Sequence, residues 1–140
     1  LFKKGETDFD QSYYFPIETI SIPDIKGNKA NYIYSKTYTG NGKLYGYFNV
    51  PGYVSNPPDY VNDKSMQTFE IDVYNKTVKK MNFDGTTGWS CSQCKAGDYM
   101  VFGMASTQGT GYYLYNYKED KYEPLKIKTE GNPFKIQYLK

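Results

Sequence analysis

The residues best suited to chemistry in this chain are two cysteines, Cys91 and Cys94, separated by two positions. A structural zinc site needs four ligands, and the chain has no third cysteine and no histidine to complete one. A redox-active C-x-x-C pair should begin a helix in a βαβ unit, whereas this pair lies between strand-like segments. Two interpretations remain, a short-range disulfide in an exported protein and a pair of reduced loop thiols, and we expect the disulfide.

Histidine and arginine are both absent, which restricts the reactions that the chain can serve. A serine-hydrolase triad lacks its His, and bidentate recognition of phosphate by guanidinium groups is excluded. A glycosidase needs two carboxylates in a defined geometry, and nothing singles out two of the 15 acidic residues. We therefore predict that the protein is not an enzyme, and we expect no catalytic residue, no cofactor and no resident metal.

The charges nearly balance, with 17 basic residues against 15 acidic ones and a net charge of +2. This excess is too small to favour a nucleic-acid partner, and we expect none. The apolar runs are only a few residues long, so no membrane-spanning segment is predicted. The chain begins at Leu1 without Met and without an apolar signal core, so we expect a mature product or a piece of a longer protein.

The clearest pattern is an internal repeat. Residues 69–83 match residues 113–127 after a shift of 44 positions, and both copies alternate apolar and polar side chains with period two. This period is typical of strands. Each copy is interrupted by a polar pair, Asn75-Lys76 or Glu119-Asp120, where we expect a hairpin turn. A repeat of about 40–45 residues is the spacing of one four-stranded propeller blade.

We therefore predict a single all-β region over residues 1–140, with about two four-stranded β-propeller blades plus a terminal strand and almost no helix. The first unit covers about 9–83, the second about 87–127, and the terminal strand 134–139. Further strands are expected at 12–17 and at 28–39, the latter matching 98–103. Pro124 cannot donate to a central ladder, so its strand should be outermost. Because propellers close with about four to eight blades, the remaining blades or a second chain must complete the ring.

The first unit contains an insertion, predicted at 42–65 between its second and third strands. Gly, Pro and Asn interrupt this segment, which favours a loop, and its aromatic side chains make it the best candidate for a binding site. A flap that packs only on its own Tyr residues is the structural alternative. Lysine charge and aromatic faces together suit an anionic, ring-bearing small ligand. The candidate contacts are Lys43, Tyr45, Tyr47, Tyr53, Tyr60, Lys64 and Trp89.

The opening motif Lys4-Gly5-Glu6-Thr7-Asp8-Phe9-Asp10, followed by Ser12-Tyr13-Tyr14-Phe15, resembles the C-terminal portion of a family of Bacteroidetes outer-membrane lipoproteins with a β-propeller fold. The order of strands and hairpins over 68–81 and 111–125 is also similar. The resemblance would cover nearly all of this chain and about the last third of a full-length member.

The resemblance implies an outer-membrane anchored protein at the cell surface or facing the periplasm, beside a TonB-dependent receptor. It also implies capture of ferric siderophores, whose iron arrives already coordinated. No family motif assigns binding residues to this chain. Two other functions remain open, namely a carbohydrate-binding module, because aromatic faces with Asp and Asn also suit sugar rings, and a partner-docking module with Tyr-rich faces.

Overall fold

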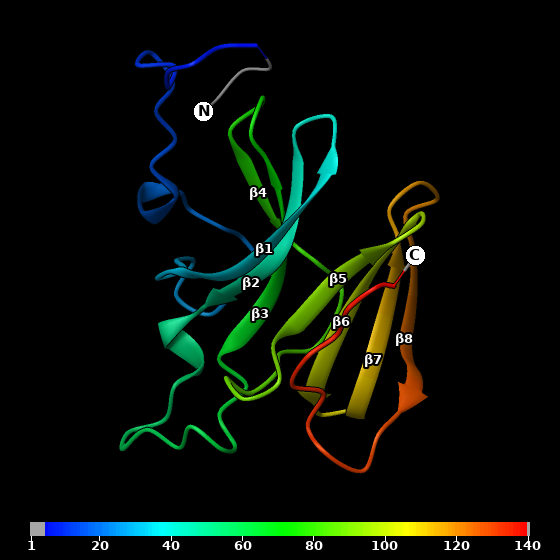
Figure 1. Ribbon diagram of the computed structural model, residues 1–140. Helices are drawn as coiled ribbons and strands as arrows, with labels where there is room; N and C mark the ends of the chain where they lie inside the picture. Colours follow the sequence, from blue (N-terminus) through cyan, green and yellow to red (C-terminus); the bar gives the residue numbers. More distant parts are fainter. Residues whose placement is uncertain (1–4, 140) are drawn as a thin grey trace.

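The computed structural model describes residues 5–139 and contains eight strands in two sheets (Figure 1). Within each sheet, strands that follow one another in the chain lie side by side and are antiparallel. The predicted all-β class is confirmed, since the only helices in this part of the chain are two three-residue 3₁₀ turns, Ile17–Thr19 and Pro51–Tyr53. Lys4, the first residue of the opening motif, lies outside the described residues.

The first sheet has the order β1-β2-β3-β4 and the second has the order β5-β6-β7-β8. The strands of the first sheet are β1 Ile33–Gly40, β2 Lys43–Asn49, β3 Met66–Asp72 and β4 Thr77–Lys80. Those of the second are β5 Ser92–Ala96, β6 Tyr99–Ser106, β7 Gly109–Asn116 and β8 Lys121–Lys128. β8 is an edge strand, as Pro124 predicts.

The predicted hairpin repeat is confirmed, and the two hairpin turns even share the same side-chain hydrogen bonds. Asp72 ends β3, and its Oδ1 accepts the backbone N–H groups of Tyr74 and Asn75. Asn116 ends β7, and its Oδ1 accepts the N–H groups two and three residues further on. Each turn then places a residue in the left-handed region, Lys76 with φ 53° and Asp120 with φ 52°. Side-chain acceptors of this kind favour such turns, which explains why both copies keep an Asx residue there.

The two sheets pack face to face on an aromatic core. Tyr47 of β2 meets Phe102 of β6 edge-on at 5.6 Å, and Tyr45 lies 5.5 Å from Tyr115. Edge-on and tilted pairs at these distances are the favourable aromatic geometries. The buried residues of this inter-sheet core are Tyr45, Tyr47, Met66, Met81, Phe83, Cys91, Met100, Phe102, Met104, Tyr113 and Tyr115.

The other face of the first sheet is covered by the N-terminal segment. Ile22 and Ile25 are buried against Phe48, Phe69 and Ile71 in a second core. The predicted strand at 12–17 is therefore wrong: this part of the chain forms turns and the 3₁₀ turn Ile17–Thr19. Its apolar side chains pack onto the face of the sheet, while its backbone does not pair with any strand.

The predicted insertion at 42–65 is also wrong in its first part, because Lys43–Asn49 is the central strand β2. Pairing makes β1 the counterpart of β5 and β2 the counterpart of β6, so residues 28–39 do not match 98–103. The true insertion is the connection 50–65, which corresponds to a two-residue turn, Thr107-Gln108, in the second sheet. Gly46 looks like a loop residue in the sequence, yet a Cβ there would overlap the Ser35 carbonyl oxygen.

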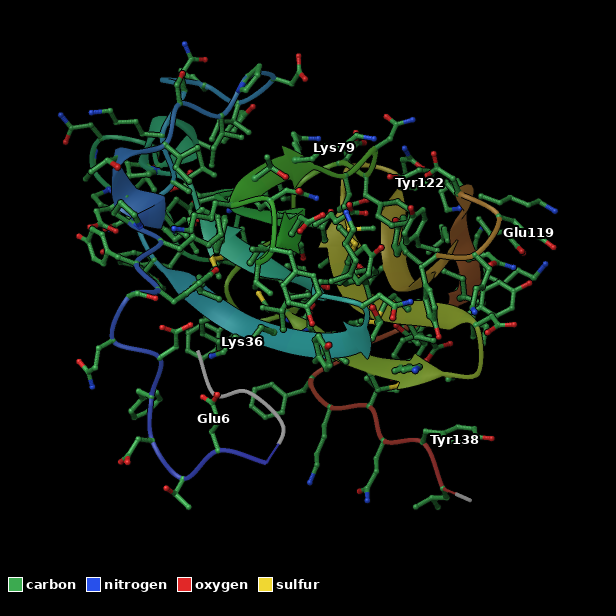
Figure 2. The ribbon with its side chains drawn as sticks, turned by 90° about the horizontal axis from the view of Figure 1, so that it is seen from above. Glu6, Lys36, Lys79, Glu119, Tyr122 and Tyr138 are labelled. Carbon is green, nitrogen blue, oxygen red and sulfur yellow. The ribbon has the colours of Figure 1, made fainter. Side chains whose placement is uncertain are left out.

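Residues 132–139 form no strand, contrary to the prediction of a terminal strand at 134–139. The segment crosses the second sheet beside β5 (Figure 1), and the Pro133 carbonyl accepts a 2.6 Å hydrogen bond from Ser92 Oγ. No neighbouring strand pairs with it among the described residues, so its backbone joins no ladder. Figure 2 shows Tyr138 and Glu6 on one side of the molecule and Lys79 of β4 and Tyr122 of β8 on the other.

We expect Gly46→Ala to lower the free energy of unfolding by about 1–3 kcal/mol, because the added methyl group must displace the backbone of β1. Urea denaturation monitored by circular dichroism measures this loss. Gly131→Ala is the matched control, since its Cβ would meet no atom within 4 Å. Equal stability of the two variants would contradict the close approach of β1 and β2 at Gly46.

Candidate functional site

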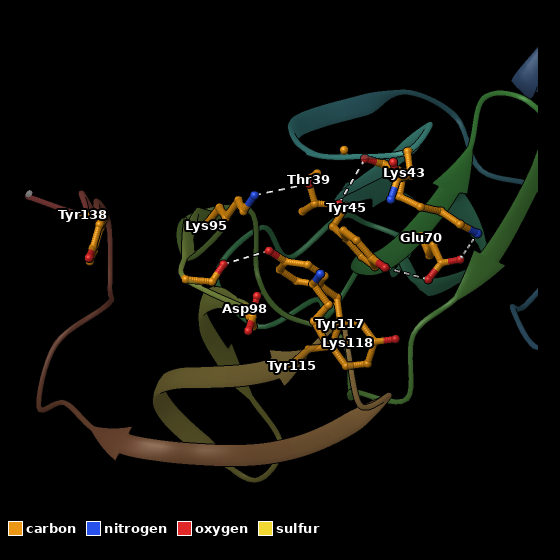
Figure 3. Close-up of a pocket in the computed structure, with 13 residues that line it drawn as sticks. Thr39, Lys43, Tyr45, Glu70, Lys95, Asp98, Tyr115, Tyr117, Lys118 and Tyr138 are labelled. Atoms are coloured by element: carbon orange, nitrogen blue, oxygen red, sulfur yellow. Dashed lines mark hydrogen bonds and ion pairs between the residues drawn. The ribbon is translucent and has the colours of Figure 1, made fainter.

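A pocket of about 780 Å³ lies between the two sheets at the end that carries the hairpin turns (Figure 3). The β1–β2 turn, the β5–β6 turn and the end of β7 surround it. We call it the polar pocket, and its ionisable side chains include Lys43, Tyr45, Glu70, Lys95, Asp98 and Lys118. The structure thus brings two of the predicted contacts, Lys43 and Tyr45, into one site.

Lys43 is neutralised by its neighbours. Its Nζ lies 2.6 Å from Glu70 Oε1 and 3.0 Å from Asp72 Oδ2. Burial disfavours the charged form, but the hydrogen bonds to Glu70 and Asp72 outweigh it and raise the pKa of Lys43. A lysine held between two carboxylates contributes little attraction for an anion, so the predicted role of Lys43 as a contact for an anionic ligand is not favoured.

Tyr45 completes this arrangement from the floor of the polar pocket. Its hydroxyl donates a 2.9 Å hydrogen bond to Glu70 Oε2. Burial, and then the nearby Glu70 carboxylate, raise the pKa of Tyr45 far above its ordinary value. The side chain is therefore a neutral phenol that presents oxygen lone pairs to the pocket.

Three charged residues on the rim were not predicted as contacts. Lys95 Nζ donates to the Thr39 carbonyl at 3.2 Å and lies 5.6 Å from the centre of the Tyr117 ring. Asp98 lies in the β5–β6 turn, and Lys118 lies in the β7–β8 turn. The sequence carries only a weak signal for them, because charged residues at strand ends and in hairpin turns are usually solvated.

Three of the predicted contacts have structural roles instead. Tyr47 is fully buried, and its hydroxyl contacts the carbonyls of Gly103 at 3.1 Å and Ser92 at 3.3 Å. The Tyr53 hydroxyl accepts the Lys26 N–H at 3.3 Å, and Lys64 Nζ donates to the Ala105 carbonyl at 2.8 Å. These hydrogen bonds join the three side chains to other parts of the chain, and none of the three lines the polar pocket.

The remaining two predicted contacts, Tyr60 and Trp89, meet in a different pocket of about 370 Å³ at the opposite end of the sheets. Tyr60 is 70% exposed and Trp89 is 58% exposed. We call this the aromatic pocket, and its aromatic residues are Tyr32, Tyr34, Tyr60, Trp89 and Phe134. Tyr32 immediately precedes β1, Tyr34 is the second residue of that strand, and Phe134 belongs to the C-terminal segment. Only their exposure in the folded chain identifies them.

The connection 50–65 holds Tyr60 in place through its own hydrogen bonds. Asp63 Oδ2 accepts the backbone N–H groups of Ser55 at 2.9 Å and Asp59 at 3.0 Å. Asp59 Oδ1 in turn accepts the N–H groups of Val61 and Asn62. Hydrogen bonds from Ser55 and Asn62, respectively, lower the pKa values of Asp63 and Asp59, so both carboxylates stay ionised as acceptors. The connection is therefore ordered around its tip.

The predicted disulfide is not formed, because Cys91 and Cys94 are both free thiols. Cys94 lies within β5, and the intervening residues are in strand from Ser92 onward. Residues three apart in an extended chain are about 10 Å apart, beyond the roughly 7 Å that a disulfide can bridge. Cys91 Sγ instead donates to the Thr87 carbonyl, and burial raises its pKa to about 12.

Comparison of the chain with protein-family models, with curated proteins and with solved structures finds no match. Within residues 5–139, no helix is long and apolar enough to cross a membrane. The same part of the chain holds no group of three or more His, Cys, Asp or Glu side chains positioned for a metal ion. The two pockets are therefore interpreted from their own geometry.

We expect two thiols to titrate per chain after denaturation without reductant. In the native protein Cys94, which is partly exposed, should react with a maleimide, whereas buried Cys91 should react only on unfolding. Mass spectrometry of the labelled protein identifies the site, and Cys94→Ser should abolish native labelling. If no free thiol is detected, the two cysteines form the disulfide that the sequence predicted.

We expect the protein to lose free energy of unfolding in acid because the Asp72 carboxylate becomes protonated. Hydrogen bonds from Asn75, and then from Lys43, hold the pKa of the Asp72 carboxyl well below its usual range. A depressed folded-state pKa contributes stability that is present above about pH 4 and is lost as the pH falls further. Asp72→Asn keeps the turn acceptor, as Asn116 does in the second sheet, and should cost about 1 kcal/mol at neutral pH.

The measurement is the urea midpoint between pH 6 and pH 2. The wild-type protein should lose more stability over this range than Asp72→Asn, while the exposed single-charge control Asp8→Asn should follow the wild type. Parallel curves for wild type and Asp72→Asn would contradict the role assigned to this carboxylate.

Proposed function

We propose that the protein is a non-enzymatic binding module that captures an anionic, ring-bearing small ligand in the aromatic pocket. The observation that carries the proposal is the convergence of five exposed aromatic side chains from four separate segments of the chain on one hollow. Exposed aromatic residues scattered singly need no explanation, but a contiguous group around a pocket is a mark of ligand or partner binding.

The charge next to the aromatic pocket favours an anion. A smaller adjoining hollow shares Tyr34, Gly88, Trp89 and Phe134 with it and is also lined by Lys135. Among the described residues that line these two hollows, Lys135 is the one side chain charged at neutral pH. Aromatic faces beside a single ammonium group suit a ligand with planar rings and negative charge.

A ferric catecholate siderophore has this chemistry, and it is the ligand class that the resemblance to the outer-membrane lipoproteins implies. Its iron is already coordinated, so the pocket would supply stacking and charge and no metal ligand. The same resemblance supports a proposed location at the cell surface or in the periplasm, anchored to the outer membrane beside a TonB-dependent receptor.

We also propose that the two sheets are neighbouring blades of a β-propeller. Their inner strands β1 and β5 lie together, linked by Gln93 Nε2 to Thr37 Oγ1 at 3.1 Å, while β4 and β8 lie at the outer edges (Figure 1). Ser35 of β1 donates to a carbonyl of the chain entering β5, and Ser92 of β5 donates likewise to the C-terminal segment. This repetition supports the C-terminal segment as the start of a third blade, with remaining blades or a second chain completing the ring.

Titration with a ferric catecholate complex tests the ligand, because Trp89 is the single tryptophan of the chain and lies in the pocket. We expect saturable quenching of its fluorescence at micromolar ligand. Tyr60→Ala should weaken binding about tenfold, since one aromatic contact contributes about 1.4 kcal/mol. Lys135→Gln should weaken binding at low salt and much less at high salt.

Tyr14→Ala is the matched control, because Tyr14 is 70% exposed, as Tyr60 is, and lines neither hollow. It should bind as the wild type does. The absence of saturable quenching, or an equal loss in the Tyr14 and Tyr60 variants, would overturn the proposal.

A further inference from the structure

The polar pocket differs in chemistry from the aromatic pocket and lies at the opposite end of the sheets. Four of its hydroxyl groups share one arrangement, in which the hydroxyl donates its proton to the protein. Tyr45 donates to Glu70, Tyr117 donates to the Gly97 carbonyl at 2.8 Å, and Thr39 donates to the Lys43 carbonyl at 3.3 Å. Tyr115, on the floor, donates to Asp120 Oδ1 at 2.8 Å. Every one of these oxygens therefore keeps lone pairs that can accept a hydrogen bond.

The donors of the polar pocket are ammonium groups on its rim. Lys95 has one hydrogen bond, to the Thr39 carbonyl, and so keeps N–H groups free. Among residues 5–139, neither the Lys118 ammonium nor the Asp98 carboxylate has a hydrogen-bonding or ion-pair partner. The rim thus offers both a free donor and a free acceptor above a floor of acceptors.

The charges of this pocket balance, which disfavours an anionic ligand. Lys43 with Glu70 and Asp72 carries one net negative charge, and Lys95 and Lys118 with Asp98 carry one net positive charge, so these charges sum to zero. A ligand that complements the donors, acceptors and balanced charges of this pocket must both donate and accept hydrogen bonds at many positions and must carry no net charge. Sugar hydroxyls have this property, since each is one donor and two acceptors.

We propose that the polar pocket is a second binding site, which takes a neutral polyhydroxylated ligand, namely a short carbohydrate. Its volume of about 780 Å³ lies within the range of roughly 300–1,000 Å³ that small-ligand sites occupy. Sugar hydroxyls accept from Lys95 and Lys118 and donate to Asp98 and to the tyrosine oxygens. This inference is independent of the ligand proposed for the aromatic pocket.

The test is isothermal titration calorimetry with neutral trisaccharides of glucose, galactose and mannose, and with a trisaccharide of galacturonic acid as the charged comparison. We expect saturable binding of at least one neutral trisaccharide. Asp98→Ala and Lys118→Ala should each weaken it by about tenfold or more, because each loses a hydrogen bond to the ligand. Lys79→Ala, an exposed change on β4, is the control and should bind as the wild type does.

Variants of one pocket distinguish the two binding proposals from each other. Tyr60→Ala should leave trisaccharide binding unchanged, and Asp98→Ala should leave quenching by the ferric catecholate complex unchanged. Thermal denaturation should show that both rim variants remain folded, since Asp98 and Lys118 are exposed turn residues. No binding of any neutral trisaccharide at millimolar concentration, tighter binding of the galacturonic acid trisaccharide, or loss of sugar binding in Tyr60→Ala alone would overturn the proposal.

Discussion

The packing of the first sheet against the second depends on a tyrosine that is fully enclosed between them. Tyr47 places its ring edge-on against Phe102, and its hydroxyl reaches the carbonyls of Ser92 and Gly103 in the neighbouring sheet. A buried hydroxyl must find partners, since leaving it unsatisfied costs roughly 1–3 kcal/mol. The contact therefore positions one sheet on the other as well as burying apolar surface.

The two pockets follow from the antiparallel order of the strands. The β1–β2, β3–β4, β5–β6 and β7–β8 turns lie at one end of the sheets, and the connection 50–65, the short β6–β7 turn and the crossing between the sheets lie at the other. Lys95 near the end of β5 and the turn residues Asp98 and Lys118 lie on the rim of the polar pocket, and the long connections bring Tyr60 and Trp89 to the aromatic pocket. A single fold thus gives its two ends different linings, and the two ligand classes proposed above rest on that difference.

Local patterns predicted the features that depend on neighbours in the chain. The repeated hairpin, the Asx residues that close it and the edge position of Pro124 follow from period two and turn chemistry. Gly46 misled the prediction because a glycine in a strand and a glycine in a loop look alike in sequence; here it allows close approach to the Ser35 carbonyl. The segments 12–17 and 134–139 have strand-like composition, but a strand also requires a partner to pair with, and neither segment has one among the described residues.

The sequence by itself determined that the chain is all-β and that one hairpin occurs twice, because these depend on residue type and short-range spacing. Tertiary structure alone decided what each side chain does. Lys43 lies between two carboxylates, Tyr47 is enclosed between the sheets, and Tyr60 meets Trp89 from a distant segment. Period two assigns a residue to a face of a sheet, but the partner across that face comes from another part of the chain, and only the packing of the two sheets selects it.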